Sequence, residues 1–87
     1  MFYTYILKSL KTGVRYIGST DDLKRRLQEH NDGIGGAFTK KHRPFEIVFY
    51  EAYIDYADAQ KSERFYKTGY GREVLSGKLE NYLKSTK

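Results

Sequence analysis

The sequence predicts a small protein of the α/β class, more closely α+β, with strands and helices in the order ββαβαα. Three observations predict it. The chain has only 87 residues, its first part holds two aromatic and β-branched runs separated by a polar stretch, and later segments with helical spacing flank a third such run. The sequence contains no internal repeat or linker, so residues 1–87 are expected to form a single domain.

Residues 2–7 and 14–17 are the first two expected strands. Both are rich in aromatic and β-branched side chains, and the stretch 8–13 between them is polar and ends in Gly13. This combination predicts a β-hairpin.

The first helix is expected at about residues 21–30. Ser19 or Thr20 can cap its N-terminus, because a hydroxyl oxygen accepts hydrogen bonds from backbone amides of the first turn. The helix should end near residues 31–33, and the glycine-rich stretch 33–36 that follows is expected to be the most flexible part of the chain.

Residues 39–44 form the most basic segment of the chain and end in Pro44, which favours an extended backbone before it. We expect this segment to be a loop. The aromatic and β-branched run at 45–53 is the third expected strand.

The second helix is expected to start at Asp55 or Asp58, either of which can cap it, and to run to about Thr68. The glycines within residues 69–71 predict a break, followed by a short third helix at 72–83.

Sixteen Lys and Arg residues against eleven Asp and Glu give a net charge of +5, which favours a polyanionic partner or an anionic membrane surface. No apolar run approaches the roughly 20 residues that span a bilayer. The absence of cysteine excludes disulfides, thiolate zinc sites and cysteine nucleophiles. A soluble, cytoplasmic protein with an open site is therefore expected.

Glu63 interrupts an otherwise apolar helical stripe formed with Tyr56, Ala59 and Tyr66, at spacings of three or four residues. A carboxylate placed among apolar groups needs a cation, either a basic side chain or a bound metal. The periodicity alone also allows a structural salt bridge, or a helix frame in which Glu63 faces water.

Arg26 and His30 lie four residues apart on the first expected helix and therefore project side by side. An arginine there can hold a phosphate through two hydrogen bonds, and a histidine can donate to phosphate or exchange a proton near neutral pH. An ordinary solvated face, with Arg26 paired to an acid, is the alternative.

Tyr3 and Tyr5 share one face of the first strand, and Tyr16 lies in the second. Tyrosine in a strand usually serves packing. A phenol beside an arginine or a metal can instead lose its proton more easily and act as a general base. Gly18, at the end of the second strand, allows backbone or substrate to approach closely.

Taken together, these residues resemble the GIY-YIG endonuclease domain, which occurs in intron-encoded homing endonucleases, in the UvrC repair incision subunit and in small stand-alone bacterial proteins. The likeness covers nearly the whole chain. Its motifs are Tyr5, Tyr16-Ile17-Gly18, Asp22-Leu23, Arg26-Leu27, His30-Asn31, Thr39-Lys40-Lys41, Pro44, Glu51, Ala59, Glu63 and the run Lys67 to Arg72.

The resemblance implies a three-stranded antiparallel sheet flanked by helices, and it implies roles for five residues. Tyr5 would be the general base and Tyr16 would assist it or orient the attacking water. Arg26 would stabilise the charged transition state, and His30 would contact the scissile phosphate or its neighbour. Glu63 would bind one divalent cation, Mg²⁺ or Mn²⁺, that stabilises the leaving oxygen.

The sequence departs from the family pattern at two places. Tyr3 and Thr4 stand where the first motif has glycine and isoleucine, a position at which stand-alone members vary. Leu75 stands where many active members carry an asparagine, and Asn81 comes six residues later. The second departure leaves either a site that manages without the asparagine or one whose activity is weak or lost.

The leading hypothesis is a metal-dependent endonuclease acting on branched, nicked or single-stranded DNA, in repair or recombination. A groove edged by Lys40, Lys41, Arg43 and Arg72 would bind the DNA. Targeting would come from a protein partner or a homodimer. The alternatives are a non-catalytic nucleic-acid-binding module that keeps the fold, and an interaction domain with no nucleic-acid role.

Overall fold

The computed structural model describes residues 1–85 and contains one antiparallel sheet with the strand order β2-β1-β3. The strands are β1 (Phe2–Ser9), β2 (Arg15–Thr20) and β3 (Phe45–Tyr53). In the central strand, Tyr5 lies opposite Gly18 of β2 and Tyr50 of β3. The strand β2 is thus one edge of the sheet, which confirms the expected three-stranded antiparallel arrangement.

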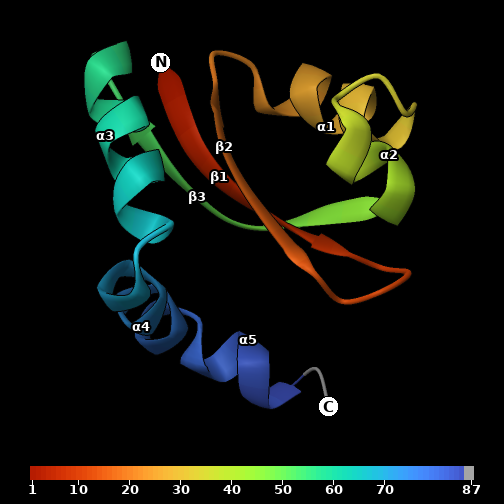
Figure 1. Cartoon of the computed structure of the whole chain (residues 1–87). Helices are drawn as coiled ribbons and strands as arrows, with labels where there is room; N and C mark the ends of the chain where they lie inside the picture. The colour runs from red at the N-terminus through yellow and green to blue at the C-terminus, as the bar shows by residue number, and fades with distance from the viewer. Residues whose placement is uncertain (86–87) are drawn as a thin grey trace.

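Five helices accompany the sheet: α1 (Leu23–Asn31), α2 (Ala37–His42), α3 (Tyr56–Tyr66), α4 (Gly69–Lys78) and α5 (Glu80–Ser85). Figure 1 shows α1 and α2 together on one side of the strands and α3, α4 and α5 on the other. The sheet therefore has a covering layer on each face.

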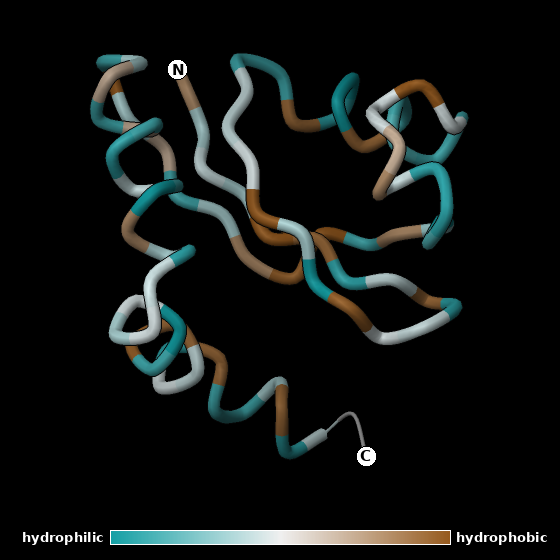
Figure 2. The backbone as a smooth tube through the Cα atoms, in the orientation of Figure 1, coloured by the Kyte–Doolittle hydropathy of each residue, from teal (hydrophilic) through white to brown (hydrophobic). Residues whose placement is uncertain are grey.

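Each face of the sheet carries its own hydrophobic core, because successive β1 residues point to opposite faces. Tyr5 and Leu7 pack with Phe45 on the α1 side, while Ile6 packs with Tyr66 and Leu75 on the α3 side. The strands are most hydrophobic in the middle of the sheet (Figure 2). Neighbouring residues of one strand thus serve two separate clusters.

Several expected boundaries differ in the structure. The strand β2 continues past Gly18, its expected end, to Thr20, and α4 begins at Gly69, before the expected residue 72. Two differences are larger. Residues 37–42, expected largely as a loop, form the short helix α2, whose last turn holds three basic side chains beside the negative end of the helix dipole. The expected third helix is divided at Leu79, whose backbone leaves the helical conformation. The sequence pattern predicted neither feature, since α2 depends on contacts with α1 and the break at Leu79 on packing in the apolar cluster.

Side-chain caps mark the starts of α1, α3 and α4. Asp22 caps α1 by accepting the Arg25 amide at 3.0 Å, in place of the expected Ser19 or Thr20. Asp55 caps α3, one of the two expected residues. Thr68 caps α4 and accepts the Gly71 amide at 2.9 Å, so the break between α3 and α4 precedes the glycines.

Within residues 1–85, no helix combines the length and the apolar character that crossing a membrane requires.

Candidate active site

The centre of the candidate site is a buried contact between a tyrosine of β1 and a histidine of α1. The Tyr5 hydroxyl lies 3.0 Å from His30 Nε2. His30 is 0% exposed and Tyr5 is 2% exposed. Both side chains are thus sequestered from bulk water on the α1 face of the sheet.

The second ring nitrogen of His30 contacts α2. His30 Nδ1 lies 2.8 Å from Thr39 Oγ1, and the Thr39 hydroxyl donates to the Gly36 carbonyl at 3.4 Å. Gly35 packs so closely against the imidazole that a Cβ at this position would overlap Nδ1. The glycine-rich segment before α2 therefore lets the chain close over His30.

Tyr16 and Gly18 of β2 flank the buried pair. The Tyr16 ring centre lies 5.0 Å from that of His30 and 6.4 Å from that of Tyr5. A Cβ on Gly18 would lie 2.5 Å from the Tyr5 hydroxyl oxygen. Glycine at this position is required because the register sets it directly opposite Tyr5.

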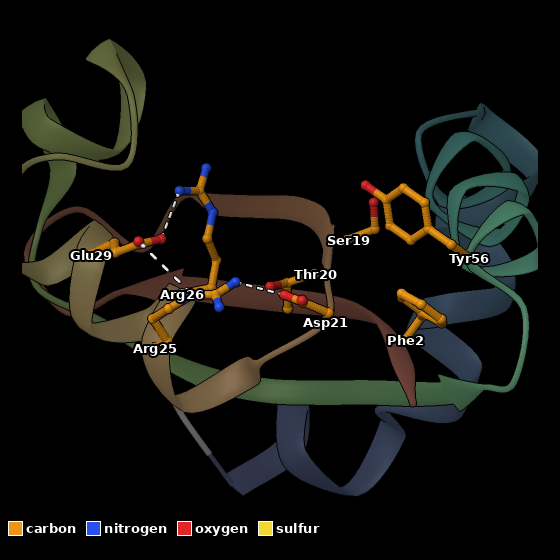
Figure 3. A pocket seen from close by; sticks show the side chains of 8 residues that line it. All are labelled: Phe2, Ser19, Thr20, Asp21, Arg25, Arg26, Glu29 and Tyr56. Atoms are coloured by element: carbon orange, nitrogen blue, oxygen red, sulfur yellow. Dashed lines mark hydrogen bonds and ion pairs between the residues drawn. The ribbon is translucent and has the colours of Figure 1, made fainter.

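Arg26 of α1 lies at the rim of an open hollow. Its guanidinium donates to Glu29 Oε1 at 3.0 Å and to the Gly35 carbonyl at 3.2 Å, and 30% of its side chain is exposed. In Figure 3, Arg26 and Glu29 lie on one side of the hollow and Ser19 and Tyr56 on the other. Arg26 can therefore meet a ligand while its position is held from two directions.

Burial controls the protonation states of the central pair. Burial raises the pKa of Tyr5 to about 12, although the neighbouring Arg26 guanidinium acts in the opposite direction. Burial, with a further contribution from the positive charge of Arg26, lowers the pKa of His30 to about 4. At neutral pH the phenol is protonated and the imidazole is neutral.

Glu63 lies on the opposite side of β2 from this pair. Its Oε1 accepts the Ser19 hydroxyl at 2.6 Å, and its Oε2 pairs with Lys67 Nζ at 2.7 Å. The side chain is 23% exposed. Because Ser19 and Gly18 are adjacent on the edge strand, Glu63 and Tyr5 approach the same edge from the two faces of the sheet.

The residues around Glu63 suit only a cation that keeps most of its water. Among residues 1–85, no three His, Cys, Asp or Glu side chains converge on one point. One partly exposed carboxylate beside a hydroxyl matches the oxygen ligands and retained hydration of Mg²⁺, whereas a zinc or calcium site needs more protein ligands. The Lys67 ammonium would have to move for a cation to bind Oε2.

The basic residues expected to bind DNA separate into two groups. Lys40 and Lys41 lie in the last turn of α2, and Arg43 follows it, donating to the Asn31 carbonyl at 3.3 Å. Arg72 belongs to α4 and lies elsewhere, in a groove described next.

A groove of about 320 Å³ runs beside Tyr16 and has no acidic residue in its lining. The residues that line it are Arg15, Tyr16, Ile17, Phe38, Lys67 and Arg72. Within the described chain neither Arg15 nor Arg72 forms an ion pair. Phe38, which is 46% exposed, stacks on Tyr16 with ring centres 6.1 Å apart. The groove thus presents positive charge and an aromatic face to a ligand.

Several residues of the site were not predicted as site residues. Thr39 and Ser19 contact His30 and Glu63 through hydroxyls, and Arg15 and Phe38 line the basic groove. Only the inclusion of Thr39 in a family motif hinted at one of them. Hydroxyl and aromatic residues carry no local signal of which distant side chain they will contact.

Leu75 lies in the apolar cluster on the α3 face and is 2% exposed. It supplies hydrophobic packing at the position where the family resemblance expects an asparagine. Asn81 lies in α5 with its side chain exposed.

The chain resembles known proteins over most of its length. The family model described as the GIY-YIG catalytic domain matches residues 1–77. The UPF0213 protein YazA of Bacillus subtilis is 37% identical over 65 residues, which is 75% of this chain and 65% of that protein. This chain thus spans just under two thirds of YazA. A UPF0213 protein of Clostridium perfringens is 36% identical over 97% of this chain and 96% of its own length.

A solved structure also resembles this fold. The solution NMR structure of a UPF0213 protein from Bacillus halodurans superimposes with a TM-score of 0.51 at 32% sequence identity. The similarity covers 88% of this chain and 84% of the other.

Proposed function

Because the chain belongs to the GIY-YIG catalytic-domain family, we propose that it is a divalent-metal-dependent endonuclease that hydrolyses phosphodiester bonds of DNA. One observation carries the proposal. Tyr5, Tyr16, Arg26 and His30 gather at one side of the edge strand β2, and Glu63 reaches the same edge from the other side. Metal-dependent phosphodiester hydrolysis uses a base, a cationic group and a metal ligand around one phosphate.

The tyrosines would activate the attacking water. Tyr5 is nearly buried, so we assign the first contact with water to Tyr16, which lines the open groove. Tyr5, whose hydroxyl is protonated at neutral pH, would accept the proton while it passes its own hydroxyl proton to His30 Nε2. In place of the phosphate contact that the resemblance implies, His30 would act through Tyr5, because its ring is fully enclosed.

Arg26 would stabilise the charge that develops on the phosphate. Its guanidinium is partly exposed at the open hollow, and its two protein contacts, with Glu29 and the Gly35 carbonyl, orient it before substrate arrives. A preorganised cation is effective because no reorganisation is needed during the reaction.

Glu63 would hold the cation, with Ser19 fixing the orientation of its carboxylate. When bound, Mg²⁺ or Mn²⁺ would supply positive charge to the leaving oxygen. Lys67 would be released from Glu63 and would remain in the basic groove, where it can contact a phosphate.

The DNA backbone would lie along the basic groove, with Arg15 and Arg72 as phosphate contacts and Lys40, Lys41 and Arg43 forming a second basic surface near α2. We propose a cytoplasmic role in repair or recombination on branched, nicked or single-stranded DNA. A protein partner or homodimer would provide targeting.

A cleavage assay tests this function. Labelled duplex, single-stranded, flap and branched DNA, together with RNA, would be incubated with Mg²⁺, Mn²⁺ or EDTA. We expect cutting that needs the metal and falls at least a hundredfold in Arg26→Ala and Glu63→Ala. Glu80→Ala, which alters an exposed carboxylate of α5, is the matched control and should cut like the wild type.

The cleavage assay, together with a DNA-binding measurement on the same proteins, separates the nuclease from a binding module. The buried Leu75, in place of a polar side chain, is the observation that favours a module without catalysis. If the folded wild type binds DNA but cuts none of the substrates, and Glu63→Ala binds equally well or more tightly, the binding module replaces the nuclease.

A further inference from the structure

The hydrogen bonds around His30 form a chain that starts at Tyr5 and ends on the backbone of α2. Its members are the Tyr5 hydroxyl, His30 Nε2, His30 Nδ1, Thr39 Oγ1 and the Gly36 carbonyl. A neutral imidazole has one N–H donor and one bare acceptor nitrogen, so the direction of the chain depends on the tautomer.

The groups at the two ends of the chain favour one direction. At one end, the Thr39 hydroxyl donates to the Gly36 carbonyl at 3.4 Å, so it offers a lone pair to Nδ1–H; the same carbonyl also accepts the Lys40 amide at 3.0 Å. At the other end, the Arg26 guanidinium can only donate and lies close enough to Tyr5 to alter its pKa. The Tyr5 proton is then best directed away from Arg26, toward Nε2.

We propose that Thr39 is a positioning residue that holds His30 as the Nδ1–H tautomer, so that the Tyr5 hydroxyl donates to Nε2 and keeps a lone pair free. The proposal rests on the function proposed above, in which Tyr5 accepts a proton from water. A general base must offer a lone pair to the proton that it receives, and a protonated phenol can accept one only as its own proton moves to His30 Nε2 along the existing hydrogen bond. The opposite tautomer would donate Nε2–H to Tyr5 and direct the phenol proton toward the cation and the water.

Because His30 and Thr39 are buried, the tautomer of His30 depends on the single hydroxyl of Thr39. His30 and Thr39 are 0% and 1% exposed, so no bulk water replaces a lost partner. Among the described residues every buried side-chain nitrogen and oxygen has a hydrogen-bond partner. Thr39→Val keeps the shape of the side chain and removes both functions of the hydroxyl, which leaves an Nδ1–H without an acceptor.

The experiment is nitrogen-15 NMR of the full chain labelled at histidine, with kinetics on the same samples. His30 and His42 are the two histidines of the chain, so assignment needs one variant, His42→Gln. We expect wild-type His30 to be protonated at Nδ1 and bare at Nε2. Thr39→Val should shift it toward the Nε2–H form and lower kcat about tenfold or more, with KM unchanged, and Thr39→Ser should restore both.

The chain offers a matched control. Thr12 Oγ1 lies 3.1 Å from His42 Nδ1, a second threonine–histidine contact that is exposed and separate from Tyr5. Thr12→Val should leave kcat and the His30 spectrum unchanged.

Two results would overturn the proposal: an Nε2–H tautomer in the wild type, or an unchanged His30 tautomer in Thr39→Val. If Thr39→Val fails to fold, the wild-type tautomer and Thr39→Ala, which also lacks the hydroxyl, still decide. A wild type that cuts no DNA removes the proposed nuclease function, whereas the spectra still decide whether Thr39 sets the tautomer.

Discussion

At the scale of single residues, one buried contact sets the behaviour of two titrating groups. Tyr5 and His30 are uncharged at neutral pH because each is removed from water, and burial penalises the charged form of both. The uncharged pair is therefore compatible with the folded state at neutral pH. When acid protonates the imidazole, the buried charge lowers the free energy of unfolding.

This pair predicts a loss of stability in acid. The folded-state pKa of His30 is about 4, below the ordinary 6.5, so between these values the unfolded chain binds more protons than the folded one. The contribution is fully present above pH 6.5 and disappears as the pH falls toward 4. We expect about 2 kcal/mol of the free energy of unfolding to be lost between pH 7 and pH 5 through this group.

Urea unfolding at a series of pH values measures this loss. His30→Gln should show a flatter pH dependence than the wild type, and His42→Gln should keep the wild-type dependence. Parallel curves for wild type and His30→Gln would show that His30 is not buried as a neutral group.

Gly18→Ala is a second prediction at this scale. The new Cβ would lie 2.5 Å from the Tyr5 hydroxyl oxygen and 2.7 Å from Tyr5 Cζ. The Tyr5 ring is rigid and buried, so it has little room to move away. We expect destabilisation by about 1–3 kcal/mol, as for overpacked cores, together with loss of the Tyr5–His30 contact. In contrast, Gly77→Ala in α4 meets no atom within 4 Å and should stabilise the helix by up to about 1 kcal/mol. Equal melting temperatures for the two variants would contradict this.

At the scale of elements, Glu51 of β3 joins the strand to α3 and α4. Its carboxylate accepts from the hydroxyls of Tyr53, Ser62 and Tyr66, and from Lys78 Nζ at 3.1 Å. Burial alone would raise the pKa of Glu51, but these hydrogen bonds outweigh it and hold the pKa below its usual value. The helices α3 and α4 both contribute to one apolar cluster, and both are also hydrogen-bonded to the Glu51 carboxylate.

Glu51→Gln should therefore loosen the α3–α4 layer. Replacing an acceptor-only carboxylate by an amide removes charge-assisted hydrogen bonds, and we expect a loss of about 2–3 kcal/mol in the free energy of unfolding. Glu46→Gln is the control, because Glu46 accepts a single exposed hydrogen bond, from Tyr82. Chemical denaturation of the three proteins measures the difference, and equal midpoints for both variants would rule out this role of Glu51.

At the scale of the whole molecule, the sheet separates two layers and its β2 edge brings them together. The proposed base and the proposed metal ligand belong to opposite layers, so neither core alone contains the whole site. The net charge of +5 is unevenly distributed, because the groove beside Tyr16 is lined by three cationic residues and no acidic one.

This charge distribution predicts a salt-dependent affinity for nucleic acid. For each phosphate contact removed, the slope of log K against log salt should change by about 0.9 for duplex DNA. Arg15→Gln and Arg72→Gln should each remove one phosphate contact and so reduce the magnitude of the slope by about 0.9. Lys84→Gln changes a lysine in an exposed pair with Glu80 and should leave the slope unchanged. Fluorescence anisotropy across a salt series tests this, and unchanged slopes in the arginine variants would exclude the groove.

The sequence by itself determined the strands, the main helices and the family. The strand 45–53 was predicted without error, and the spacing of Tyr5, Tyr16, Arg26, His30 and Glu63 indicated the family. These features follow from periodicity, from turn residues and from motif spacing along the chain.

Only the tertiary structure decided how those residues are used. In the folded chain, His30 is buried between Tyr5 and Thr39, and α2 covers its imidazole. Glu63 of α3 is hydrogen-bonded to Ser19 of β2. The physical reason is that burial and hydrogen-bond partners depend on which distant segments pack together. Spacing along a chain fixes the face of an element on which a side chain lies, and the packing of elements fixes what that side chain meets.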